Sequence, residues 1–222
     1  MQFISTYKIR GSFPCDYAAD VIKNEPMFFN CDLAYAFENG GEITKDFISS
    51  LPEDWLTCNP VLDSRVHMLM KNWYPCIPGY HHDDVPRSTP TGQPNYLTPE
   101  YRSEHLCGLV NSEICPTRFV DDVVNLSEPD ISVLQYEKWH KELDSIAPNT
   151  YNAQSGKYIQ FDCDAFHTGT KAVESGWRWF IRLSRNTDRQ KNITNEIRRQ
   201  VQVYLENPIE GWCRSACTKE VM

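Results

Sequence analysis

The chain has 222 residues, of which 41% are hydrophobic and 12% aromatic, and its formal net charge is −8. This composition excludes a disordered chain, and the length suits one domain with a sizeable buried core. The acidic balance argues against a general nucleic-acid-binding protein, which needs a cationic face for the phosphate backbone, so we expect no nucleic-acid partner.

The sequence gives no sign of a membrane or secretory protein. No apolar run is long enough to cross a bilayer. The first ten residues lack the charged-then-apolar build of a signal peptide and are more typical of a strand. The nine cysteines are odd in number and irregularly spaced, which favours reduced thiols. We therefore expect a cytoplasmic protein without a membrane partner.

The first hundred residues predict helices before strands. Short helices are expected around 18–23 and 44–51, and a strand over 66–73. Residues 85–101 contain five prolines and glycines in irregular positions, which predicts a long loop. Loops of this kind on a rigid scaffold commonly carry specificity.

The middle of the chain reads as a series of short strands. The pattern predicts strands at 105–111, 117–125 and 131–136, followed by a short helix over 137–146. Near the C-terminus, 197–205 alternates imperfectly and is consistent with a late strand or a short helix.

Two further strands are expected, at 157–163 and from Trp177 onward. Successive side chains of a strand point to opposite faces. The second strand therefore has a polar face and an apolar face, made respectively by Arg178, Phe180, Arg182 and Ser184, and by Trp177, Trp179, Ile181 and Leu183. We expect the apolar face to be covered by helices or by a second sheet.

A His-x-Asp pair and a distant histidine are the candidate metal ligands. Alternation lets His81 and Asp83 share one face, and it serves His82 and Asp84 equally well. His167 follows the strand at 157–163. Two histidines and one carboxylate around a metal with open positions describe the facial triad of non-haem Fe(II) oxygenases.

The order of these residues resembles the HxD…H…R pattern of the Fe(II)/2-oxoglutarate-dependent oxygenases. The resemblance implies a mainly β fold with flanking helices around a double-stranded β-helix (jelly-roll) core. That core would cover about 66–185 of a single domain spanning 1–222. It also implies a dioxygenase, most simply a hydroxylase, with Fe(II) and 2-oxoglutarate as cofactors and O2 as a further reactant.

The same resemblance assigns site residues. His81, Asp83 and His167 would bind Fe(II), and no other catalytic residue is implied. The pair His81/Asp83 is favoured over His82/Asp84 because an aromatic residue, here Tyr80, commonly precedes the histidine in this family.

Two arginines extend the pattern. Arg178 stands eleven residues after His167, the usual offset of the arginine that binds the far carboxylate of 2-oxoglutarate. Arg182 lies where the taurine-dioxygenase-like branch holds an anionic substrate group, although an ion pair with a protein carboxylate, or an exchange of the two roles, is also open. The substrate would be a small anionic or amino-acid-like molecule, or a protein side chain. A cupin-like binding module without catalysis is the alternative reading.

Overall fold

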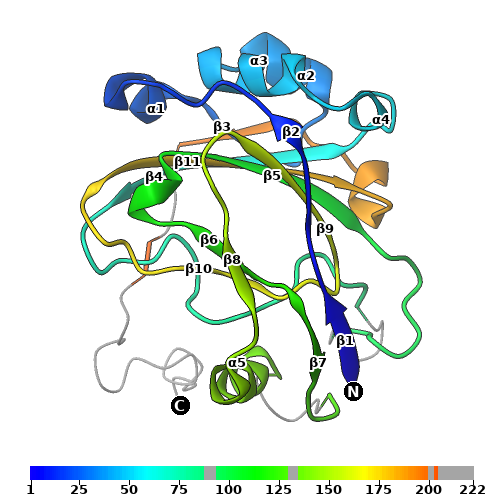
Figure 1. Cartoon of the computed structure of the whole chain (residues 1–222). Helices are drawn as coiled ribbons and strands as arrows, with labels where there is room; N and C mark the ends of the chain where they lie inside the picture. The colour runs from blue at the N-terminus through cyan, green and yellow to red at the C-terminus, as the bar shows by residue number, and fades with distance from the viewer. Residues whose placement is uncertain (88–93, 130–134, 200–202, 205–222) are drawn as a thin grey trace, which may run out of the picture.

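The computed structural model describes residues 1–87, 94–129, 135–199 and 203–204, and it is mainly β, with antiparallel sheets and flanking helices (Figure 1). The larger sheet has the strand order β2 (Lys8–Ser12), β9 (Lys157–Asp162), β5 (Glu104–Val110), β11 (Gly176–Arg185) and β4 (Val61–Leu69). The smaller sheet has the order β10 (His167–Gly169), β6 (Thr117–Val120) and β8 (Thr150–Asn152). Two-stranded pairings join β1 (Gln2–Ser5) to β7 (Asp122–Asn125) and β12 (Glu196–Arg198) to β3 (Met27–Phe29).

Four helices cover the outer face of the five-stranded sheet (Figure 1). They are α1 (Ala19–Asn24), α2 (Leu33–Asn39), α3 (Glu42–Ser49) and α4 (Glu53–Leu56). Phe47 of α3 packs in one cluster with Trp179, Ile181 and Leu183 of β11, all of them fully buried. The predicted apolar face of this strand is therefore confirmed, and helices cover it.

The inner face of the large sheet packs on the small sheet. Leu109 of β5 and Ile159 of β9 share a buried cluster with Phe119 of β6, and the Phe119 and Phe161 ring centroids are 5.0 Å apart. Helix α5 (Gln135–Ile146) lies on the other side of the small sheet (Figure 1). This packing places the polar face of β11 in the space between the two sheets.

Several predicted boundaries differ from the structure. The strand expected at 66–73 is β4, which begins five residues earlier. The sequence pattern missed this beginning because the buried polar residues Asp63 and Ser64 interrupt the apolar alternation. The segment 117–125 divides into β6 and β7, which pair with different strands.

The strand expected at 131–136 is wrong at its end, where Gln135 and Tyr136 belong to α5; 131–134 lie outside the described residues. Of 197–205, the structure describes a strand that ends at Arg198. Within the described part of the chain, no helix has the length and apolar character needed to span a bilayer.

Candidate metal centre

His81, Asp83 and His167 come together between the sheets, with one potential ligand atom from each residue within 4.8 Å of the others. The two histidines are paired through their backbones, since the amide of His81 donates to the carbonyl of His167 at 3.0 Å and the reverse bond measures 3.1 Å. This bridge extends the small sheet beyond β10 and fixes both imidazoles at its edge.

Both imidazoles present their Nε2 atoms to the site. The Nδ1 atom of His81 lies 3.0 Å from the carbonyl oxygen of Gly79, and that of His167 lies 3.0 Å from the carbonyl oxygen of Ala165. A carbonyl only accepts hydrogen bonds, so each Nδ1 carries the proton and each Nε2 of a neutral ring keeps its lone pair. Hydrogen bonds of this type orient metal-binding histidines in proteins. Burial lowers the pKa of His81 to about 4, which favours the neutral ring.

The Asp83 carboxylate completes the group. Burial alone would raise the pKa of Asp83, but Arg182 and His167 hold it well below its ordinary value. Asp83 Oδ2 lies 3.2 Å from His167 Nε2. The lone pairs of these two atoms would repel each other at this distance unless a proton or a metal ion lay between them. Two imidazole nitrogens and one carboxylate are a donor set that suits Fe(II).

His82 and Asp84, the other pair that the spacing allowed, lie outside this group. The His82 ring packs on Phe166 at a centroid distance of 3.8 Å, and its Nδ1 lies 3.1 Å from the Tyr96 hydroxyl. Asp84 has a positive φ of 50° and accepts a 3.4 Å hydrogen bond from Tyr101. The structure thus brings together the residues that the family resemblance favoured, and metal binding by them stays a prediction.

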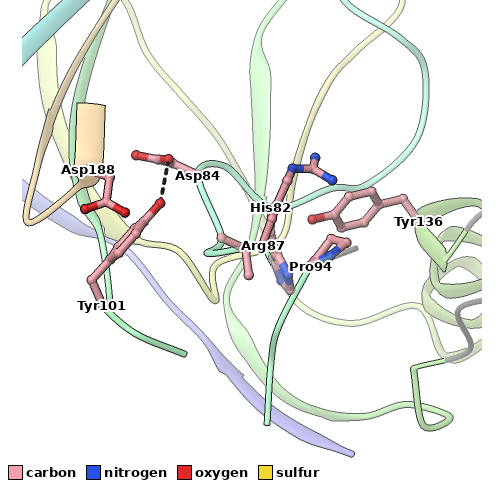
Figure 2. Close-up of a pocket in the computed structure, with 8 residues that line it drawn as sticks. His82, Asp84, Arg87, Pro94, Tyr101, Tyr136 and Asp188 are labelled. Carbon is pink, nitrogen blue, oxygen red and sulfur yellow. Dashed lines mark hydrogen bonds between the residues drawn. The ribbon is translucent and has the colours of Figure 1, made fainter. Parts of the chain in front are cut away.

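A polar pocket of about 360 Å³ lies beside this segment (Figure 2). Its lining is His82, Asp84, Val85, Arg87, Pro94, Tyr101, Tyr136 and Asp188. Asp84 and Asp188 flank the Tyr101 ring on one side, and Tyr136 lies with Arg87 on the other (Figure 2). The pocket therefore gathers the residues of the second His-x-Asp pair, not those of the candidate metal centre.

Arg178 is a buried cation without a carboxylate partner among the described residues. The residue is only 2% exposed. Its Nη2 donates to Thr117 Oγ1 at 2.9 Å, whereas its Nε has no hydrogen-bond partner. Burial lowers the pKa of Arg178. A buried guanidinium without a counter-charge is costly. Arg178 is therefore a candidate for binding an anion inside the protein.

Arg182, in contrast, is already paired. Its Nη2 lies 3.1 Å from Asp63 Oδ2, and its Nη1 contacts Asp83 Oδ2. The structure shows the ion pair between Arg182 and a protein carboxylate that the sequence left as an alternative. Arg182 therefore has protein partners in this structure, and binding of a substrate anion by it stays a prediction.

Sequence reasoning missed three residues of this region. Thr117 binds Arg178, Asp63 binds Arg182, and His67 lies opposite Arg178 in the register of β4 and β11. Asp63 and His67 are four residues apart on one strand, so alternation predicts that they share a face once the bounds of β4 are known.

A scan of models of protein families finds no match to this chain, and searches of curated proteins and of solved structures find none either.

Proposed function

We propose that this protein is an Fe(II)/2-oxoglutarate-dependent oxygenase, with His81, Asp83 and His167 as metal ligands. The observation that carries the proposal is the meeting of these three side chains near a buried Arg178 that has no carboxylate partner among the described residues. Arg178 bonds Thr117, which pairs with Gly169, two residues after His167. When bound, iron and 2-oxoglutarate would supply the activation of O2, with release of succinate and CO2.

The pairing of strands supports a jelly-roll core. From β4 onward the segments pair in a nested way: β4 with β11, His81 with His167 at the start of β10, β5 with β9, and β6 with β8. The first segment thus pairs with the last and the second with the second-last. A long hairpin folded on itself into two sheets has this order, which is the pattern of a jelly roll.

The chemistry of the donors supports the metal. The Nδ1 bonds to Gly79 and Ala165 leave both Nε2 lone pairs directed at one point, and Asp83 is held ionised beside them. A ligand set that is ordered before the metal arrives loses little freedom on binding it.

Arg178 supports the cosubstrate. A planar guanidinium matches a carboxylate with two parallel hydrogen bonds, and burial makes the pair stronger. We propose that Arg178, with the Thr117 hydroxyl beside it, binds the 5-carboxylate of 2-oxoglutarate. The substrate is a small molecule or a protein side chain. Because Arg182 pairs with Asp63 and Asp83, it gives no independent support for an anionic group on that substrate.

Turnover of 2-oxoglutarate tests the proposal. Purified protein is incubated with Fe(II), O2 and 2-oxoglutarate, with and without a panel of amino acids, small organic acids and peptides, and succinate is measured. We expect succinate above the protein-free level, and its loss in Asp83→Ala. If the unaltered protein neither forms succinate nor binds Fe(II) or Mn(II), the proposal is wrong and a cupin-like binding module becomes the better account.

A further inference from the structure

We infer that Arg182 is a positioning residue for Asp83: its guanidinium holds this carboxylate toward His81 and His167, and Asp63 holds the guanidinium. The inference rests on the proposed function, because it treats the three residues as metal ligands. It is carried by one side chain that bridges two carboxylates, with Nη1 on Asp83 and Nη2 on Asp63.

The three candidate ligands are not fixed in the same way. His81 and His167 each have a backbone bridge and an Nδ1 hydrogen bond to a carbonyl. The Asp83 carboxylate is instead held by side chains, Arg182 and His167. His167 would turn its Nε2 lone pair to a metal, so Arg182 is the contact that persists when the site is filled.

Asp63 makes Arg182 a fixed donor. The two residues are direct partners in the register of β4 and β11. Asp63 is 5% exposed and accepts further bonds from Arg189, at 2.7 and 2.8 Å, and from the amide of Asn30 at 3.0 Å. A carboxylate with four donors around it is a rigid anchor for the guanidinium.

The charges around Arg182 determine whether this residue strengthens or weakens metal binding. A lone guanidinium beside the ligands would repel a divalent cation. Here Arg182 is paired with Asp63 on the side away from Asp83, so its repulsion of a metal ion is offset. The main effect of Arg182 is then to orient Asp83. Loss of a residue that orients a metal ligand commonly lowers metal affinity about 10- to 100-fold.

The experiment is a titration of the whole protein with Co(II), followed through the visible absorption of the bound ion, with thermal unfolding of each metal-free variant measured in parallel. Arg182→Met keeps an unbranched side chain, shorter than arginine, and removes both contacts. Arg182→Lys keeps the charge, but one ammonium cannot bridge two carboxylates as the two arms of a guanidinium do. Arg185→Gln is the matched control, because Arg185 lies on the same strand and pairs with Asp54 and Glu104, away from Asp63 and Asp83.

We expect Arg182→Met to bind Co(II) about 10- to 100-fold more weakly and Arg182→Lys to fall between it and the unaltered protein. Arg185→Gln should bind Co(II) as tightly as the unaltered protein, because its ion pairs do not reach Asp63 or Asp83. Arg182→Met that binds Co(II) as tightly as the unaltered protein, or more tightly, overturns the inference and leaves the proposed function standing. If Arg182→Met does not fold, Arg182→Lys with unaltered affinity and spectrum overturns it equally. An unaltered protein that binds no metal removes the proposed function itself.

Discussion

Arg178 of β11 lies directly opposite His67 of β4, and both side chains are buried with one nitrogen unpaired among the described residues, Nε in Arg178 and Nδ1 in His67. Burial lowers the pKa of His67 to about 3, helped by the positive charge of Arg178, so the imidazole is neutral. The fold therefore keeps a cation beside an imidazole with one unpaired nitrogen in its interior. Such an arrangement costs stability unless a ligand completes it.

Replacement of Arg178 should consequently stabilise the ligand-free protein. Arg178→Met puts an apolar side chain in its place, and replacement of buried ion pairs by apolar residues can gain about 1–4 kcal/mol in the free energy of unfolding. Urea unfolding without 2-oxoglutarate measures this difference. Arg185→Met is the control on the same strand, because Arg185 is paired with Glu104 and Asp54 and its loss should give no gain. A loss of stability in Arg178→Met would mean that the guanidinium is satisfied by the protein alone.

The same arginine should decide the affinity for 2-oxoglutarate. Truncation of one partner of a buried charge pair commonly costs about 2–5 kcal/mol, so Arg178→Ala should weaken 2-oxoglutarate binding at least about 30-fold. Arg178→Lys should retain part of the affinity because its charge survives without the fork. Isothermal titration with Mn(II) in place of Fe(II) measures both. If Arg182→Ala abolishes binding of 2-oxoglutarate and Arg178→Ala does not, the assigned roles must be exchanged.

Metal should stabilise the folded protein through His81, Asp83 and His167 only. Mn(II) at about 100 times its dissociation constant adds about 2.7 kcal/mol, which for this size raises the melting temperature by about 5–10 °C. Alanine at any of the three positions should abolish this rise. His82→Phe is the control, since it keeps an aromatic ring against Phe166 and should still show the rise. Loss of the rise in His82→Phe, with retention in His81→Ala, would shift the site to the other pair.

Stability should fall as the pH falls below neutrality, because burial lowers the pKa of His67, His81, His82 and His105 and keeps these rings neutral. Burial lowers the pKa of His67 and of His105 to about 3. Between about pH 6.5 and 3 the unfolded chain binds protons at these rings and the folded protein does not, so each ring contributes a slope approaching 1.4 kcal/mol per pH unit.

His105→Gln tests this slope, since it removes one of these rings. His105 bonds Ser184 at 2.9 Å and Ser103 at 3.1 Å, and glutamine offers polar atoms to the same hydroxyls. Unfolding free energies at pH 7, 6 and 5 should change less steeply in this variant. An equal slope would show that His105 is protonated in the folded protein.

Alternation in the sequence predicted β9 and β11 well, because each has a regular apolar face. It could not place the beginning of β4, where Asp63 and Ser64 interrupt the pattern. Asp63 is buried only because Arg182 and Arg189, more than a hundred residues away, neutralise it. The local sequence contains no sign of such partners.

The candidate site shows the same division. Spacing alone left His81/Asp83 and His82/Asp84 equal, and packing of His82 against Phe166 separates them. The pairing of Arg182 with two carboxylates was also beyond the sequence. It depends on the register between β11 and β4 and on the path of the chain after His81.

Crystals of the protein grown with Mn(II) and 2-oxoglutarate test the central claim most directly, through the anomalous signal of the metal. We predict one Mn(II) bound to His81 Nε2, His167 Nε2 and an Asp83 carboxylate oxygen, with the 5-carboxylate of 2-oxoglutarate on the Arg178 guanidinium. A Mn(II) peak away from these three side chains, or none at saturating metal, would contradict the account.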